Sequence, residues 1–171
     1  MGRARAAAGS LVFLVLAPGV VAGFVPWWIT RWETRTPLTW WGPLRVVGVV
    51  LLGAGVLVLL HAFVRFVMEG VGTPSPVAPT ERLVVGGLYR YVRNPMYLAV
   101  LAIVVGQALA LGRLELLLYS AALVVAFVAF VRWYEEPTLR RRFGADYEAY
   151  SRAVPAWWPR GRPWAGPGTE A

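Results

Sequence analysis

The chain has 171 residues, of which 58% are hydrophobic, and its net charge is +8 with every basic residue an arginine. Soluble domains contain about 45–50% apolar residues, so this composition favours one membrane domain. The absence of cysteine excludes disulfides, thiolate catalysis and zinc–sulfur sites, and the single histidine, His61, excludes a multi-histidine metal centre within one chain. We therefore expect the positive charge to meet lipid headgroups, and we expect no metal or nucleic acid.

Four apolar segments follow one another along the chain. They run from Ser10 to Ile29, from Leu44 to Met68, from Met96 to near Gly112 and from Leu114 to Val131. A membrane-spanning helix needs about 20 mostly apolar residues. The last two segments are separated only by Gly112 and Arg113, which predicts a tight helical hairpin. The sequence thus predicts an all-α, polytopic membrane protein with about four transmembrane helices.

The first apolar segment has a second interpretation. Arg3 and Arg5 precede it and small residues lie near its end, which is also the pattern of a secretory signal peptide. Its length, together with Trp27 and Trp28 at its end, favours a membrane helix with an interfacial aromatic belt.

The distribution of arginines predicts the orientation of the chain. Loops on the cytoplasmic side of a membrane carry an excess of basic residues. With the N-terminus inside, the inner segments hold six arginines and the whole Arg-rich region from Arg132 onward, whereas the outer segments hold four. Both termini are therefore predicted to be cytoplasmic. The exclusive use of arginine among the basic residues hints at a GC-rich bacterial genome, so we expect the membrane to be a bacterial inner membrane.

Two cytoplasmic segments are more than connections. One is the Pro/Gly-rich loop from Glu69 to Pro95, and the other begins at Arg132 with charges and aromatic residues. We expect three regions: residues 1–68 as two scaffold helices, residues 69–159 as a functional core, and residues 160–171 as a disordered Gly/Pro-rich tail. Any site built from the core would lie at the cytoplasmic interface.

The start of the third helix gathers cationic and aromatic residues. Asn94 suits an N-cap and Pro95 the first helical position, which explains part of the pattern. Arg90 and Arg93 beside free helix N–H groups also suit a carboxylate or a phosphate. Tyr89, Tyr91 and Tyr97 offer rings on which a flat ligand could stack.

The region after the fourth apolar segment combines two carboxylates with a helical stripe. Glu135 and Glu136 stand at the end of a membrane helix, where they are costly unless paired or used. Arg132 and Arg140 are placed at i−4 and i+4 to pair with Glu136. The 3.6-residue spacing of the stripe predicts an amphipathic helix, and its members are Leu139, Phe143, Tyr147, Tyr150 and Val154.

Three other features have modest interpretations. His61 and Gln107, inside apolar segments, are expected to form hydrogen bonds between helices rather than to catalyse. The loop from Gly70 to Pro76 is rich in turn formers, but no Gly-Lys-Ser/Thr follows, so it is not a P-loop.

Taken in order, these motifs resemble the isoprenylcysteine carboxyl methyltransferases, part of a wider group of membrane methyltransferases that includes phospholipid N-methyltransferases. The resemblance covers about Glu69 to Pro159. Its elements are Arg-Asn-Pro-Met-Tyr from Arg93, a helical hairpin, Glu135-Glu136, the pattern Phe-Gly-x-x-Tyr-x-x-Tyr from Phe143, and Pro155. The loop from Gly70 to Pro76 is similar to the bacterial branch.

The resemblance implies S-adenosylmethionine as methyl donor and a lipid or other hydrophobic acceptor. Asn94 stands where the eukaryotic isoprenylcysteine enzymes typically have histidine, so a prenylcysteine acceptor is not implied. No catalytic base is assigned. The residues implied for the donor site are Arg90, Tyr91, Arg93, Asn94, Pro95, Tyr97, Glu135, Glu136, Leu139, Phe143, Tyr147 and Tyr150.

Two alternatives remain open at this point. A membrane-embedded reductase that uses a nicotinamide cofactor on a hydrophobic enone would have a similar fold and C-terminal motif. In a non-enzymatic membrane protein, Glu135 and Glu136 would only be paired, and neither cofactor would bind.

Overall fold

The computed structural model describes residues 17–70 and 83–166 of the chain, and these residues form helices without a strand. In chain order the elements are η1 (Val20–Phe24), α2 (Val25–Thr30), α3 (Gly42–Gly70), η2 (Gly87–Arg90), α4 (Pro95–Leu111), α5 (Glu115–Phe130), η3 (Val131–Glu135) and α6 (Glu136–Ala153). The prediction of an all-α protein is confirmed, and α3, α4 and α5 end within two residues of the predicted apolar segments. The loop from Gly70 to Pro76 lies outside the described residues after Gly70.

Within residues 17–70 and 83–166, two helices are long and apolar enough to cross a membrane, one from Gly42 to Arg65 and one from Glu115 to Ala153. Shorter apolar helices cover Ala17–Thr30 and Pro95–Leu111. Only 28% and 22% of the most apolar windows of the two long helices are buried. A core helix of a soluble protein would be mostly buried, so these exposed apolar faces favour contact with lipid. The second long helix contains both α5 and α6. Because α6 is rich in charged residues, the apolar part of this helix is α5.

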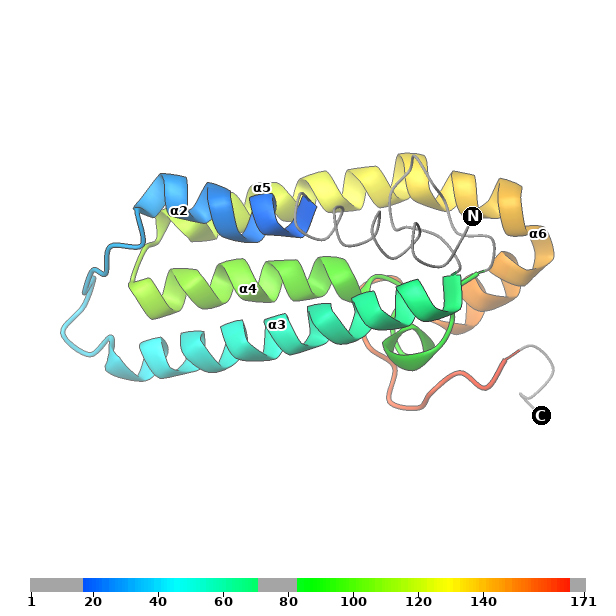
Figure 1. Ribbon diagram of the computed structural model, residues 1–171, viewed down its shortest axis with the longest axis horizontal. Helices are drawn as coiled ribbons and strands as arrows, with labels where there is room; N and C mark the ends of the chain where they lie inside the picture. Colours follow the sequence, from blue (N-terminus) through cyan, green and yellow to red (C-terminus); the bar gives the residue numbers. More distant parts are fainter. Residues whose placement is uncertain (1–16, 71–82, 167–171) are drawn as a thin grey trace. The chain divides into compact units, whose positions relative to one another are not determined.

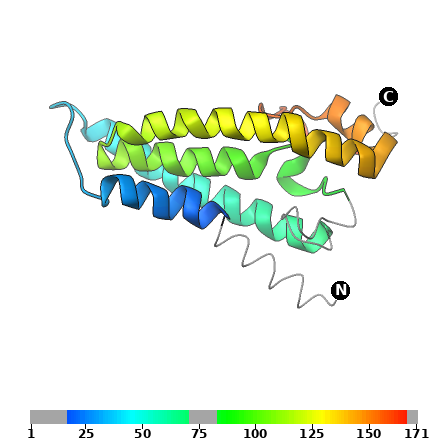
Figure 2. The same ribbon diagram turned by 90° about the horizontal axis from the view of Figure 1, so that it is seen from above.

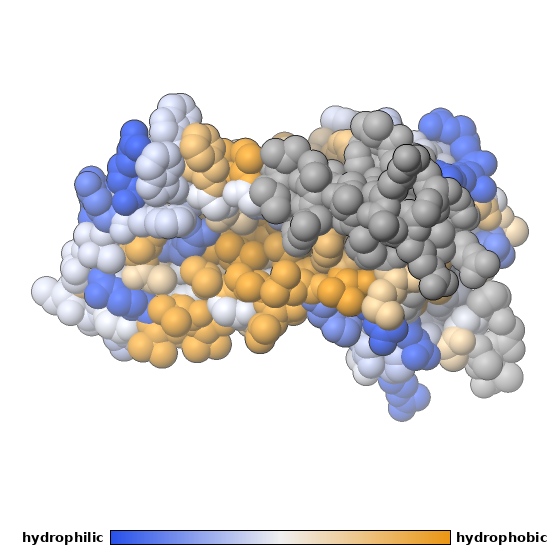
Figure 3. All heavy atoms as spheres, viewed as in Figure 1, coloured by the Kyte–Doolittle hydropathy of each residue, from blue (hydrophilic) through white to orange (hydrophobic). Residues whose placement is uncertain are grey.

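The chain divides into two compact units. Among the described residues, the helix unit comprises residues 17–60 and Met96–Phe127, and the pocket unit comprises residues 61–70, 83–95 and 128–166. In the helix unit, successive helices run antiparallel, and α4 lies between α2 and α3 in Figure 1 and beside α5 in Figure 2. Figure 3 shows hydrophobic side chains gathered over α3 and α4. Several apolar side chains of α3 are more than half exposed, among them Val46, Val50 and Leu57.

Small residues bring α3 and α4 close together in the helix unit. A Cβ atom added at Gly106 would lie 2.6 Å from the backbone nitrogen of Leu52, too close for any side chain. Such close approach of small residues is a main source of helix association in membranes. Gln107 crosses to the first helix, where its Nε2 donates to the carbonyl of Ala22 at 2.6 Å. The hydrogen bond predicted for Gln107 is thus confirmed.

Candidate functional site

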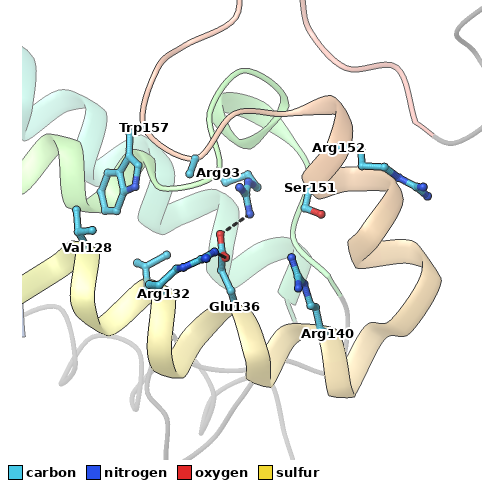
Figure 4. A pocket seen from close by; sticks show the side chains of 10 residues that line it. Arg93, Val128, Arg132, Glu136, Arg140, Ser151, Arg152 and Trp157 are labelled. Atoms are coloured by element: carbon cyan, nitrogen blue, oxygen red, sulfur yellow. Dashed lines mark hydrogen bonds and ion pairs between the residues drawn. The ribbon is translucent and has the colours of Figure 1, made fainter.

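The pocket unit contains a pocket of about 420 Å³. This volume lies within the usual range of about 300–1,000 Å³ for small-molecule sites. Its walls come from the end of α5, η3, α6, the turn before α4 and the chain after α6 (Figure 4). The lining residues are Arg93, Val128, Val131, Arg132, Glu136, Arg140, Ser151, Arg152, Ala156 and Trp157.

The side chain of Arg93 makes three hydrogen bonds at this pocket. Its Nη1 donates to Glu136 Oε1 at 2.8 Å and to the Tyr147 hydroxyl at 2.9 Å, and its Nε donates to the carbonyl of Val154 at 3.0 Å. The side chains of Arg93 and Glu136 are only 15% and 14% exposed, so their ion pair is largely shielded from water. A charge-assisted bond in such surroundings is stronger than a neutral one.

A π-helical turn sets the position of Glu136. The Glu136 N–H donates to the carbonyl of Val131, five residues back, and Pro137 follows directly. Proline has no N–H and its ring displaces the carbonyl four residues before it, which favours a widened turn. The same order occurs in η1, where the Val25 N–H donates to Val20 and Pro26 follows. Single π-turns are frequent at functional sites.

The chain after α6 is fastened to the turn before α4 by backbone hydrogen bonds. The N–H of Arg93 donates to Pro155, that of Arg160 to Tyr91, and that of Trp164 to Arg90. A side-chain hydrogen bond adds to these, because the Nε of Arg90 donates to the carbonyl of Trp164 at 2.6 Å. We call residues 154–166 the strap. The strap brings Ala156 and Trp157 to the pocket.

A small aromatic core supports the strap. It consists of Tyr147, Tyr150, Val154 and Trp164, with Leu139 and Phe143 packed against it. Burial raises the pKa of the Tyr147 and Tyr150 phenols, so both hydroxyls remain protonated at neutral pH. The Tyr150 hydroxyl donates to the carbonyl of Tyr89 at 2.7 Å. The predicted stripe of α6 therefore packs as a core.

The residues predicted from sequence fall into three groups. Arg93 and Glu136 line the pocket, and Tyr147 contacts Arg93. A supporting group holds the walls, and its members are Arg90, Tyr91, Asn94, Leu139, Phe143 and Tyr150. The buried Asn94, for example, donates from Nδ2 to the carbonyl of Ala156 at 3.1 Å. The third group, Pro95, Glu135 and Tyr97, does not line the pocket. Pro95 is the first residue of α4, and Glu135 is the last residue of η3. Tyr97 lies in the helix unit, where the centre of its ring is 4.8 Å from that of Phe127.

Sequence reasoning missed several lining residues. Val128, Arg132, Glu136 and Arg140 recur every four residues along one continuous helix, and that spacing could have placed them together. The predicted pair of Arg132 with Glu136 is present at 4.0 Å. The predicted pair of Arg140 with Glu136 is absent from the described part of the chain. Ser151 lies near the end of α6, and Ala156 and Trp157 come from the strap, where no helical periodicity exists.

The described tail also differs from expectation. Residues 160–171 were expected to be disordered from their composition, yet Trp164 is only 6% exposed and packs on Tyr150 with ring centroids 5.4 Å apart. The indole and the backbone bonds of the strap outweigh the Gly/Pro-rich composition. Residues 167–171 lie outside the described part. His61 is exposed, and no hydrogen bond joins its side chain to another helix among the residues that the structure describes; its Nε2 lies close to Gly87.

A family model described as phospholipid methyltransferase matches residues 43–146. The match covers more than half of the chain and includes Arg93, Glu136 and most of α6. No curated protein and no solved structure matches the chain.

Proposed function

The chain belongs to the phospholipid methyltransferase family, and from that membership we propose that it transfers a methyl group from S-adenosylmethionine to a lipid acceptor at the cytoplasmic face of the membrane. The family makes the protein a membrane methyltransferase of the lipid-methylating kind. The donor, the interface and the residues that hold the donor are parts of the proposal. We further propose that the membrane is the bacterial inner membrane and that both termini are cytoplasmic.

The observation that carries the proposal is the shielded pair of Arg93 and Glu136 in the pocket. S-Adenosylmethionine has a carboxylate, an ammonium and a sulfonium group, so its site needs both charge signs. Within the described residues, the Nη2 group of Arg93 has no hydrogen-bond partner, and it suits the carboxylate. Glu136 Oε2 lies 4.0 Å from Arg132 and is available to the ammonium. Trp157 offers a ring face for the adenine or the sulfonium.

Methyl transfer requires little from the protein beyond the positioning of the donor and the acceptor. The donor supplies a methyl group on a sulfonium sulfur, which is already activated for displacement. The pocket residues align the two reactants and keep water away, and such alignment can lower a reaction barrier by about 7–11 kcal/mol. Glu136 is the only carboxylate among the described lining residues. Because its Oε1 already accepts from Arg93 at 2.8 Å, we assign Glu136 to binding rather than to proton transfer.

Titration calorimetry on the detergent-purified protein tests this proposal. We expect saturable binding of S-adenosylmethionine and of its demethylated product, and no binding of a nicotinamide cofactor. Glu136→Gln should weaken donor binding by at least about tenfold, because a charge-assisted contact is lost. Glu148→Gln is the matched control, since Glu148 is exposed on the same helix and does not line the pocket.

Two results would contradict the proposal. Equal donor affinity in the two glutamate variants would remove Glu136 from the site. Binding of the nicotinamide cofactor in place of the donor would favour the membrane reductase instead.

A further inference from the structure

Part of the strap forms a short arch that is attached at both ends to the turn before α4. At one end the N–H of Arg93 donates to the carbonyl of Pro155 at 2.9 Å. At the other end the N–H of Arg160 donates to the carbonyl of Tyr91, also at 2.9 Å. Because each residue spans at most about 3.6 Å, the residues between these two bonds stay close to the turn.

The middle of the arch contains two consecutive tryptophans with different surroundings. Trp157 lines the pocket, whereas Trp158 is 81% exposed. No described residue accepts a hydrogen bond from the indole N–H of Trp158. Trp158 therefore presents both an apolar ring and a free donor, the combination that suits a surface where lipid tails meet polar headgroups.

The position of Trp157 shows which part of the membrane helix the arch reaches. Trp157 lines the pocket together with Val128 from the last turn of α5 (Figure 4). Val128 is 43% exposed and lies inside the apolar segment that ends at Val131. Consecutive Cα atoms are about 3.8 Å apart, so Trp158 lies near this end of the apolar segment. The end of an apolar membrane helix lies where hydrocarbon gives way to headgroups.

Other exposed aromatic residues at this end of α5 have the character of a membrane interface. Phe130 and Tyr134 are 40% and 47% exposed, and their rings stack with centroids 5.1 Å apart. Trp133, between them in the sequence, is 80% exposed. Tryptophan and tyrosine at the end of an apolar helix are typical of the lipid–water boundary. The surface next to the arch thus continues the lipid-facing surface of α5.

We propose that Trp158 is a membrane anchor at the tip of the strap, inserted into the lipid interface at the pocket end of α5. Its partner is the bilayer surface itself and not a lipid bound in the pocket, so the contact does not depend on the reaction that the protein catalyses. The anchor also holds Trp157 in the pocket wall, because the two residues are adjacent. The pocket is therefore fully assembled only at a membrane surface.

The depth of residue 158 in the bilayer tests this inference. The chain contains no cysteine, so Trp158→Cys in the full chain takes a single nitroxide spin label. In nanodiscs of phosphatidylcholine and phosphatidylglycerol, power saturation compares the accessibility of the label to oxygen, which concentrates in lipid, with its accessibility to a water-soluble nickel chelate. We expect the label at residue 158 to favour oxygen.

Arg141→Cys is the control for this measurement. Arg141 is exposed on the charged helix α6 and does not line the pocket, so a label there should favour the nickel chelate. Both labelled proteins should melt like the wild type, because neither side chain is part of the core. A label at residue 158 that is as accessible to the chelate as the label at residue 141 would overturn the inference.

Donor affinity in nanodiscs tests the link between the anchor and the pocket. Trp158→Gln should weaken donor binding by about threefold or more, because the arch must then be ordered without the lipid contact. Trp158→Phe keeps an apolar ring and should weaken it less. Trp28→Gln should bind the donor like the wild type, since Trp28 is 64% exposed in the helix unit and does not line the pocket.

The outcomes separate this inference from the proposed function. Wild-type donor affinity in Trp158→Gln would overturn the link between the anchor and the pocket. A wild type that binds no donor would remove the proposed function, whereas the depth of residue 158, measured without the donor, would still support or overturn the anchor.

Discussion

At the scale of the residue, the pocket depends on the geometry of one guanidinium group. Arg93 donates from Nε and Nη1 to three acceptors on α6 and the strap. A lysine at this position would keep the charge but could not reach Glu136, Tyr147 and Val154 together, because its single nitrogen is a point donor. Arg93 therefore joins elements as well as lining the pocket.

We expect a graded loss of stability at this position. Arg93→Lys should keep the ion pair and lose about two hydrogen bonds, which corresponds to about 2 kcal/mol. Arg93→Gln should cost about 3 kcal/mol or more, because it leaves the shielded Glu136 carboxylate unpaired. Thermal unfolding in detergent should rank wild type above Arg93→Lys and Arg93→Gln last, with Arg141→Lys unchanged. A lysine variant as stable as the wild type would show that the two lost bonds contribute nothing.

The chemistry of single residues was partly predictable from the sequence. Carboxylates at the end of a membrane helix are costly unless paired or used, and that argument selected Glu135 and Glu136. Arginines beside free helix N–H groups suit an anion, and that argument selected Arg90 and Arg93. Arg90 proves to support the strap, as does Asn94, which was expected as an N-cap and through the resemblance. The sequence could not separate lining from supporting residues, because that difference depends on partners more than 60 positions away, such as Ala156 for Asn94.

At the scale of the element, the helices were predictable and their irregularities were not. Hydropathy locates α3, α4 and α5 because lipid selects uniformly apolar helices of fixed length. The π-turns of η1 and η3 and the break in α6 interrupt no apolar pattern. Their causes are Pro26, Pro137 and Gly144, which are all visible in the sequence. A proline or glycine within a helix can end it, bend it or widen one of its turns, however, and packing with other elements decides which of these occurs.

Gly144 provides the second test at this scale. It divides α6 with φ +50° and ψ −123°, a conformation that costs other residues of order 1–3 kcal/mol. No atom lies within 4 Å of a Cβ added there, so Gly144→Ala should be destabilising through the backbone alone. Gly161→Ala is the matched control, because Gly161 is equally open and has no positive φ.

The measurement is thermal unfolding of both variants together with donor affinity. Gly144→Ala should lower the melting temperature and weaken donor binding, because α6 and the strap depend on the break for their packing. Gly161→Ala should match the wild type. Equal melting temperatures for the two variants would mean that the chain relaxes around residue 144 without cost.

At the scale of the whole molecule, the membrane character was predictable and the role of the strap was not. The apolar content and four helical segments define the class of protein before any contact is known. The strap follows the last helix and is rich in proline and glycine, with Gly161, Pro163 and Gly166 near its end, a composition typical of disorder. Its order comes from the long-range bonds with Arg90, Tyr91 and Arg93, for which the local sequence contains no signal.

The strap therefore leads to the last prediction. A chain that ends at Ala153 would lack Val154, Trp164, Ala156 and Trp157, and with them part of the aromatic core and of the pocket wall. Three backbone hydrogen bonds and the acceptor for Arg93 Nε would go as well. We expect this chain to insert into membranes with its helical circular dichroism largely retained, since the apolar helices precede the cut, but to lose donor binding.

A chain that ends at Gly166 is the control, because it keeps every contact of the strap. It should bind the donor like the full-length protein. If the chain ending at Ala153 bound the donor equally well, the strap could not be part of the site, and the donor would have to be held by α6 and the turn before α4 alone. Loss of binding only in the shorter chain would make the strap a working wall of the pocket rather than a tail.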